Sequence, residues 1–304
     1  MTRLLNLDFK APIIDRIDCD LLDQHQVSLG VLRLDQIHPL INGNKWFKLK
    51  RNIEYARSNN LSRIVSFGGA YSNHIYSLAA AGKLFGFETV GFIRGELMLP
   101  LNPVLAFAQF QGMKLVALSR SEYKNKQNPD FIRSLHQQFS NSYILPEGGA
   151  NDLALEGCAE IVRWLEWQTA SKNRYIAVAC GTGSTLAGLV KGVSDSLMAP
   201  VPELIGIAVL KGQGYLQQEV VRWLLGTTLI KPVNWSVIEQ YHCGGYAKSS
   251  AELRAFLGEF AGMAPIPAEP VYTGKLFYGV FDMLKSGSIP PNSEVIAIHS
   301  GGVH

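Results

Sequence analysis

From residue 60 onward, short runs of apolar residues alternate with longer segments in which apolar positions recur every three or four residues. The short runs predict β-strands and the periodic segments predict helices. The predicted strands are "RIVSFG", "ETVGFIRG", "KLVALS", "YILPEGG", "RYIAVACG", "ELIGIAVL", "WSVIEQYHC" and "EVIAIHSGG". The predicted helices span residues 72–86, 101–112, 129–140, 154–169, 184–196, 214–225 and 249–262. This alternation predicts an α/β fold of open, twisted, mostly parallel sheets, and the number of strands predicts two sheets.

A further helix is predicted to begin inside "NGNKWFKLKRN", residues 42–52. Gly43 and Asn44 supply a turn and an N-cap, which places Lys45 at the first helical position. The partial positive charge of a helix start disfavours an ammonium group and lowers the pKa of the amine. A lysine with a lowered pKa is a nucleophile for carbonyl compounds, and it forms Schiff bases with them. On these residues alone, a solvated surface lysine also explains the position.

Three predicted strands run directly into glycine-rich polar turns, "GGAYSNH", "CGTGSTLAG" and "HSGG". In the second turn, two glycines allow backbone N–H groups to approach a ligand, three hydroxyl groups can donate to anionic oxygens, and a helix start points at the same place. The residues concerned are Gly181, Thr182, Gly183, Ser184 and Thr185. They predict a phosphate site, or else an ordinary helix cap. The turn lacks the lysine of a P-loop and the G-x-G-x-x-G spacing, which argues against a nucleoside triphosphate or NAD.

The first turn opens the helix at 72–86, and Ser72 is a plausible N-cap. Capping leaves Asn73 and His74 unexplained, since both are mediocre helix formers placed at the carboxyl end of a strand, where ligands bind. A lone histidine can also be a surface residue. One ligand would use all these features: pyridoxal 5′-phosphate needs a lysine for its aldehyde, a phosphate site, a donor to its ring hydroxyl and a partner for its pyridine nitrogen. Lys45, the 181–185 turn, Asn73 and Ser300 would supply them in that order.

Composition narrows the class of protein. The chain has 304 residues, 47% of them apolar and 17% charged, as expected for a globular protein with one or two large cores. The net charge of +3 and the absence of long basic runs predict no nucleic-acid partner. No apolar stretch is long enough for a signal peptide or a membrane span, so we expect a cytoplasmic protein. The four cysteines are far apart and form no C-x-x-C pair, so neither a disulfide framework nor a metal site is predicted.

Five segments together resemble the tryptophan-synthase-like, fold type II pyridoxal-phosphate enzymes, and within them the branch of 1-aminocyclopropane-1-carboxylate deaminase and D-cysteine desulfhydrase. The segments are "GNKWFKL", "SFGGAYSNH", "GTGSTLAG", "YTGK" and "HSGG", and they keep the family's order over nearly the whole chain. The resemblance implies a small domain at 51–145 inserted into a large pyridoxal-phosphate domain built from 1–50 and 146–304. It also implies a homodimer.

The resemblance also implies a role for each matching residue. Lys45 carries the cofactor, and the turn from Cys180 to Thr185 holds its phosphate. Asn73 holds the ring hydroxyl, while Ser72 lies near the substrate carboxylate and the reacting carbon. With Tyr71, the Ser72, Asn73 and His74 segment forms the expected substrate-binding side.

Two positions divide the branch, and both carry a hydroxyl residue in this chain. The ring-opening deaminases have Glu after the Tyr of Y-x-G-K and Leu after the His of the last motif, where this sequence has Thr273 and Ser300. The desulfhydrases have small hydroxyl residues at both, so the resemblance favours that side. A carboxylate beside the pyridine nitrogen would keep it protonated and strengthen the electron sink, whereas a hydroxyl leaves a weaker sink that suits substrates with a good leaving group.

The resemblance therefore implies β-elimination from a small D-amino acid, most plainly D-cysteine, to pyruvate, ammonia and hydrogen sulfide. Tyr246 and Tyr272 are candidates for the acid or nucleophile at the reacting carbon, or for walls of the pocket. Tyr71 and the 146–152 segment depart from the family pattern, and both bear on the choice of substrate. The alternatives are deamination of 1-aminocyclopropane-1-carboxylate, elimination from another β-substituted alanine, a protein that stores or senses pyridoxal phosphate, and coincidental glycine turns.

Overall fold

The structure is a computed structural model that describes residues 9–302. Its contacts divide the chain into two compact units. Unit 1 contains residues 9–44 and 158–302, and unit 2 contains residues 45–157. The boundaries of the inserted unit thus lie at 44/45 and 157/158, compared with the 50/51 and 145/146 that the sequence suggested.

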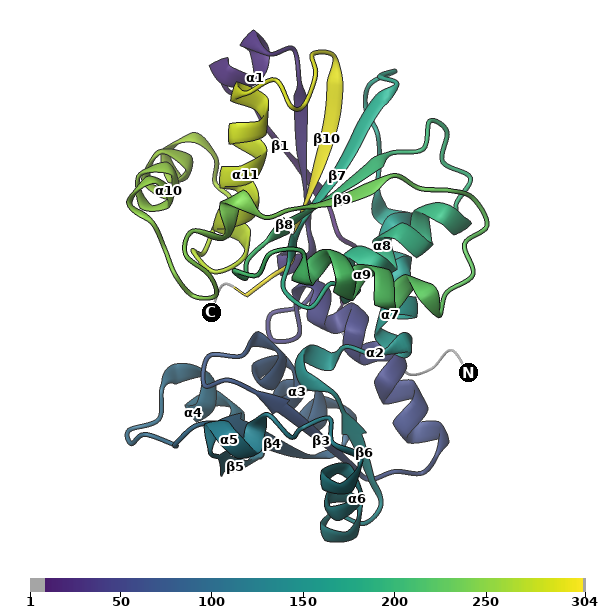
Figure 1. Cartoon of the computed structure of the whole chain (residues 1–304), viewed down its shortest axis with the longest axis vertical. Helices are drawn as coiled ribbons and strands as arrows, with labels where there is room; N and C mark the ends of the chain where they lie inside the picture. The colour runs from purple at the N-terminus through teal and green to yellow at the C-terminus, as the bar shows by residue number, and fades with distance from the viewer. Residues whose placement is uncertain (1–8, 303–304) are drawn as a thin grey trace. The chain divides into compact units, whose positions relative to one another are not determined.

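Unit 1 is built on a six-stranded sheet with the strand order β1-β2-β10-β7-β8-β9 (Figure 1). Strand β1 pairs antiparallel with β2, and all the other neighbours are parallel. The strands are β1 (Ile14–Ile17), β2 (Ser28–Arg33), β7 (Asn173–Cys180), β8 (Glu203–Ala208), β9 (Trp235–Ile238) and β10 (Ser293–His299). Because β10 and β7 are parallel neighbours, their carboxyl ends lie at the same edge of the sheet.

Helices cover both faces of this sheet, as expected for a buried parallel sheet. On one face, α1 (Asp20–Gln24), α10 (Ala251–Met263) and α11 (Thr273–Lys285) share a core with β2, β7, β8 and β10. Helices α8 (Ser184–Asp195) and α9 (Tyr215–Leu225) lie on the other side of the sheet (Figure 1). Short 3₁₀ turns are η1 (Leu34–Gln36), η3 (Glu160–Trp164) and η4 (Gln240–His242).

Unit 2 is built on a four-stranded parallel sheet with the order β5-β4-β3-β6. Its strands are β3 (Arg63–Gly68), β4 (Glu88–Arg94), β5 (Lys114–Leu118) and β6 (Ser142–Leu145). The remaining elements of the unit are α3 (Asn73–Phe85), α4 (Pro103–Phe110), α5 (Arg120–Tyr123), α6 (Pro129–Gln138) and the 3₁₀ turn η2 (Glu147–Gly149). Helices α2 (Gly43–Ser58) and α7 (Asp152–Ala159) cross the unit boundaries.

The predicted fold class, with two mostly parallel sheets, is confirmed. The predicted helix at 154–169 is wrong: α7 ends at Ala159, a 3₁₀ turn follows, and Leu165 is extended. Ile161 and Val162 are buried in that turn, so the apolar periodicity continues where the α-helix does not. The predicted start of α2 is also wrong, because the helix begins at Gly43 and Asn44 lies inside it.

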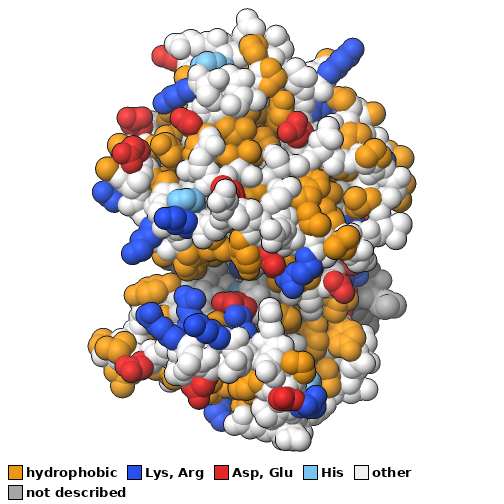
Figure 2. Space-filling model, in the orientation of Figure 1, with side chains coloured by type: hydrophobic (Ala, Val, Ile, Leu, Met, Phe, Trp, Pro, Cys, Tyr) orange, Lys and Arg blue, Asp and Glu red, His pale blue; other side chains and the backbone are white. Residues whose placement is uncertain are grey.

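Within residues 9–302, no helix is long and apolar enough to cross a membrane. Figure 2 shows basic, acidic and hydrophobic side chains interspersed on the visible face of unit 1. All four cysteines belong to the described part of the chain, and no disulfide joins them.

Candidate active site

The turn between β7 and α8 has the geometry of an anion site. Gly183 is the N-cap of α8 with φ +77°, in the left-handed region, and no side chain caps the helix. Thr182 Oγ1 and Ser184 Oγ lie 3.0 Å apart, within hydrogen-bond distance of one another. The indole Nε1 of Trp223 donates to the carbonyl oxygen of Thr182 at 3.1 Å, which fixes the turn from the side of α9. An uncapped helix start, two hydroxyls and a glycine backbone together suit a phosphate group.

The start of α2 is held by the same unit. Asn44 donates from Nδ2 to Oγ1 of Thr185 at 3.0 Å, and its backbone N–H donates to the carbonyl oxygen of Ser300 at 3.1 Å. Gly43 has φ +64°, and a Cβ atom there would overlap that carbonyl oxygen. Only glycine fits this position, because both the backbone conformation and the space exclude a side chain. The predicted N-cap residue Asn44 therefore binds the turn after β7 instead of capping α2.

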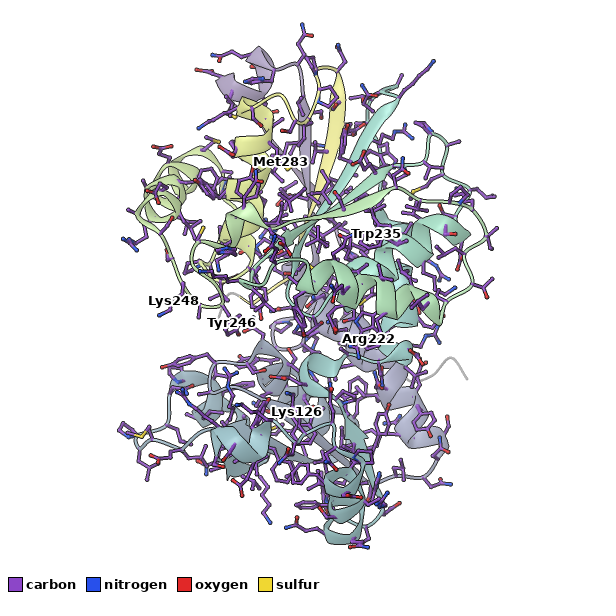
Figure 3. All side chains as sticks on the ribbon, in the orientation of Figure 1. Lys126, Arg222, Trp235, Tyr246, Lys248 and Met283 are labelled. Atoms are coloured by element: carbon purple, nitrogen blue, oxygen red, sulfur yellow. The ribbon has the colours of Figure 1, made fainter. Side chains whose placement is uncertain are left out.

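Two tyrosines predicted for the site lie together next to this turn. The ring of Tyr272 packs against Gly181, where an added Cβ would lie 3.3 Å from Cε1. Tyr272 Oη donates to Tyr246 Oη at 3.4 Å, and the two rings meet edge to face with centroids 6.0 Å apart. Tyr246 stands on the loop between η4 and α10, where Figure 3 labels it, and 41% of its surface is exposed. The structure therefore brings Tyr246, Tyr272 and Gly181 together within unit 1.

Thr273 is fully buried, and its hydroxyl has local partners. Oγ1 accepts from the backbone N–H of Glu269 at 3.0 Å and lies 3.4 Å from Glu269 Oε1. The Glu269 carboxylate accepts from the backbone N–H groups of Val271, Tyr272 and Thr273 at 2.6, 2.8 and 2.8 Å. This carboxylate therefore caps the start of α11, and the Thr273 hydroxyl is part of that cap.

Ser300 follows β10 at the edge where the turn after β7 also begins, and 8% of its surface is exposed. The preceding residue, His299, is fully buried and donates from Nε2 to the carbonyl oxygen of Pro267 at 2.7 Å. Burial lowers the pKa of His299, with Asp35 acting in the opposite direction. Ser300 is thus a hydroxyl residue at the sheet edge, directly after a buried histidine.

Lys275, the last residue of "YTGK", is completely buried, and the sequence analysis gave it no role. Its ammonium donates to the carbonyl oxygens of Gly245 and Val209 at 2.8 and 3.3 Å. Burial lowers its pKa, although Cys243 and Glu269 oppose this shift. Because Gly245 precedes Tyr246, Lys275 holds the loop that carries this tyrosine.

In unit 2, Ser72 is the N-cap of α3, and its Oγ accepts from the backbone N–H of Ile75 at 3.3 Å. The backbone N–H of Ser72 donates to Gly69. The N–H groups of Asn73 and His74 then stand at the positive end of the helix. Tyr71 is 71% exposed. The structure thus confirms the predicted capping role of Ser72 and presents two further amides at the same helix start.

His74 is buried, with 1% of its surface exposed, so it is not a surface histidine. Its Nε2 lies 2.8 Å from Ser66 Oγ, and Nδ1 has no hydrogen-bond partner among residues 9–302. Burial holds the pKa of His74 well below 6.5, and the charges of Lys45 and Lys48 lower it further. Lys45 itself is half-buried, in the first turn of α2, and it is the first residue of unit 2.

The chain belongs to the pyridoxal-phosphate dependent enzymes: the model of this family matches residues 17–301. Pyridoxal phosphate is therefore its cofactor, and the chain is an enzyme with the fold type II architecture. The turn after β7 fits the phosphate group of this cofactor, because an uncapped helix start without a Cβ at Gly183 leaves backbone N–H groups for an anion. Among the described residues, no group of three His, Cys, Asp or Glu side chains could hold a metal ion.

Proteins that are similar in sequence and structure indicate the branch of this enzyme family. A protein from Thermotoga maritima named "Putative 1-aminocyclopropane-1-carboxylate deaminase" is 29% identical, over 93% of this chain and 91% of its own. The "D-cysteine desulfhydrase" of Yersinia enterocolitica is 26% identical, over 89% of this chain and 86% of its own. A solved structure titled "Crystal Structure Analysis of the ACC deaminase homologue" superimposes with a TM-score of 0.80 at 25% identity, covering 98% of this chain and 91% of its own. The predicted family resemblance is confirmed, and these names support pyridoxal-phosphate-dependent elimination.

Three supporting residues were missed by the sequence analysis: Ser66, Glu269 and Lys275. Glu269 had a signal, because an acidic residue just before a helix start is a common cap, but the helix of residues 273–285 was itself not predicted. Lys275 belongs to a motif that carried the family resemblance, but its burial could not be predicted from the sequence, since a lysine is usually exposed. Ser66 lies in a buried strand, and nothing in the sequence indicated that its hydroxyl contacts His74, eight residues further on.

Proposed function

We propose that this enzyme catalyses β-elimination from a small D-amino acid, with D-cysteine as the first candidate. The reaction removes the α-proton, breaks the bond between Cβ and sulfur, and releases hydrosulfide. The 2-aminoacrylate that remains takes up one water molecule and gives pyruvate and ammonia. When bound, pyridoxal phosphate supplies the electron sink that makes the α-proton acidic.

One observation carries this proposal: Ser300 directly follows β10 at the sheet edge, while the carboxylate of Glu269 is bound to three backbone amides. In the ring-opening branch, Glu stands at the position of Thr273. Here that position holds a buried hydroxyl that belongs to the helix cap. Ser300 is then the hydroxyl residue that we assign to the pyridine nitrogen. A hydroxyl favours a neutral ring and a weaker sink, which is sufficient for a substrate that expels a thiolate.

We assign the remaining roles in the reaction to residues of each unit in turn. Lys45 would hold the cofactor through its aldehyde, and the Lys45 amine would be the base for the α-proton. In unit 1, residues 181–185 hold the phosphate, and Tyr272 with Tyr246 supplies a pair of hydroxyls that can give a proton to the leaving group. In unit 2, Asn73 holds the ring hydroxyl, and the amides at the start of α3 bind the substrate carboxylate.

A second candidate is deamination of 1-aminocyclopropane-1-carboxylate, because several relatives bear this name. A relative from Arabidopsis thaliana is named "Bifunctional D-cysteine desulfhydrase/1-aminocyclopropane-1-carboxylate deaminase, mitochondrial", and it is 26% identical over 86% of this chain and 69% of its own. The neutral partner of the ring nitrogen disfavours carbon–carbon cleavage, so this activity should be the weaker one. We further propose a cytoplasmic homodimer, as the family resemblance implies.

The test is to load the purified protein with pyridoxal phosphate and to supply D-cysteine, L-cysteine and 1-aminocyclopropane-1-carboxylate separately, measuring sulfide and 2-oxo acid. The proposal expects sulfide and pyruvate from D-cysteine, loss of both in Lys45→Ala, and little change in Lys50→Ala, a control on the same helix. 2-Oxobutyrate from 1-aminocyclopropane-1-carboxylate as the main product would favour the second candidate. A bound cofactor with no turnover of any amino acid would instead indicate storage or sensing.

A further inference from the structure

The hydrogen-bond chain that starts at His74 has only one consistent proton arrangement. Ser66 Oγ lies 2.8 Å from the carbonyl oxygen of Leu145 and 3.3 Å from that of Pro146, and both can only accept. The single hydroxyl proton of Ser66 therefore goes to a carbonyl. His74 Nε2, 2.8 Å from the same Oγ, must then carry its own proton and donate to Ser66.

This arrangement fixes the charge and the tautomer of His74. With its proton on Nε2, a neutral ring has a bare lone pair on Nδ1, and no acceptor for a proton on Nδ1 lies beside that atom among residues 9–302. Nδ1 faces Gly149, where an added Cβ would lie only 3.1 Å from it. The charged groups that act on the ring are the ammonium groups of Lys45 and Lys48 on α2. The carboxylate of the adjoining turn, Glu147, is bound to Tyr123 and Lys126.

The hydrogen bonds of His74 and Ser66 join three elements of unit 2. His74 is in the first turn of α3, Ser66 is on β3, and Leu145 ends β6 just before the 3₁₀ turn at Glu147–Gly149. Ser66 and Leu145 are also register partners in the parallel sheet, and both are fully buried. A buried chain of two short hydrogen bonds thus fixes the start of α3 against β3 and the end of β6.

We propose that His74 is a positioning residue: as a neutral imidazole that donates from Nε2 to Ser66, it holds the start of α3 so that the amides of Asn73 and His74 meet the substrate carboxylate. The side chain itself then does not bind substrate. The assignment of these amides to the substrate carboxylate rests on the proposed function, whereas the proton arrangement of His74 and Ser66 rests on the geometry alone.

The first experiment needs neither substrate nor turnover. In ¹⁵N-histidine-labelled protein, side-chain NMR between pH 6 and 8 should show His74 with a protonated Nε2 and an unprotonated Nδ1, and His74→Gln identifies the signal by its loss. A proton on Nδ1, or on both nitrogens at pH 7, overturns the proposal. This result stands even if the proposed activity fails.

The second experiment compares four variants by steady-state kinetics on the substrate found for the enzyme. Ser66→Ala and His74→Phe remove the donor chain and should raise KM by about ten- to a hundredfold, with the affinity for pyridoxal phosphate changed less than threefold. His74→Gln keeps an N–H donor and should recover most of the loss, and His136→Gln, an exposed histidine on α6, should behave as wild type. Unchanged KM in both donor-chain variants overturns the proposal. If Ser66→Ala does not fold, His74→Phe and His74→Gln still decide the question.

Discussion

The side chain of Asn44 donates to Oγ1 of Thr185 across 141 positions of the sequence, at 3.0 Å, and both residues are buried. Asn44 directly precedes Lys45, and Thr185 belongs to the turn that we assign to the phosphate. One hydrogen bond therefore connects the residue before the proposed cofactor lysine to the proposed phosphate site. Within unit 1, this hydrogen bond fixes Asn44 to the turn after β7 before any ligand arrives.

Replacing Asn44 by Ala should weaken cofactor binding. The change removes the bond to Thr185 and leaves a buried hydroxyl without this donor, which costs about 1 kcal/mol or somewhat more. We expect the Kd for pyridoxal phosphate, measured by absorbance titration, to rise by about five- to tenfold. Asn59→Ala, at an exposed asparagine just beyond the end of α2, is the control. Equal affinity in Asn44→Ala and Asn59→Ala would mean that the bond does not support the phosphate site.

A substitution at Ser300 should lower activity, whereas a substitution at Thr273 should lower stability. Ser300→Ala removes the hydroxyl that we assign to the ring nitrogen, so activity should fall by at least tenfold with little change in the free energy of unfolding. Thr273→Val removes a buried hydroxyl from the cap of α11 and should lower that free energy by about 1–3 kcal/mol. Urea unfolding and turnover of both variants provide the comparison. The opposite pattern would assign the ring nitrogen to Thr273.

Gly43 and Gly258 should respond to alanine in opposite directions. Gly43 has φ +64° and no room for a Cβ, so Gly43→Ala should destabilise the protein by more than about 1 kcal/mol and disturb the start of α2. Gly258 lies within α10 with open space around it, so Gly258→Ala should stabilise the protein by about 0.5–1 kcal/mol. Thermal unfolding of the two variants checks both signs. Stabilisation by Gly43→Ala would contradict the described start of α2.

The pKa of His74, held well below 6.5 in the folded protein, makes stability depend on pH. As pH falls below 6.5, the unfolded chain takes up a proton on this residue while the folded chain does not, so the free energy of unfolding decreases. The slope contributed by His74 is at most about 1.4 kcal/mol per pH unit, and it ends at the lowered pKa of the folded state. Urea unfolding at pH 7.5, 6.5 and 5.5 measures it. His74→Gln should reduce the acid-side slope, whereas His136→Gln should leave it nearly unchanged; equal slopes in all three proteins would refute a neutral buried His74.

The sequence predicted the sheets and the turns because parallel strands buried on both faces are continuous apolar runs and their ends carry glycine. Lys45 stood out because an ammonium group is disfavoured at a helix start, and Asn73 and His74 stood out because capping does not explain them. Strand β1, by contrast, was not predicted. It is a short edge strand, and its pairing with β2 depends on contacts between positions that are distant in the sequence. The same limit applies to Asn44, which is a good N-cap by local rules but binds Thr185 instead.

Side-chain burial was the other missing information. From the sequence, His74 could be either a surface residue or a ligand contact, and only the packing of α3 on β3 shows that it is buried beside Ser66. Lys275 is similar, because the two carbonyl groups that it binds come from loops far away along the chain.

The most direct test of the account is to locate the lysine that bonds to the cofactor. Borohydride reduction of the protein loaded with pyridoxal phosphate, followed by digestion and mass spectrometry, makes the carbon–nitrogen bond permanent and identifies the modified peptide. The account predicts one phosphopyridoxyl group per chain, on Lys45, and none in Lys45→Ala. Modification of Lys48 or Lys275 instead, or an equal yield in Lys45→Ala, would contradict it.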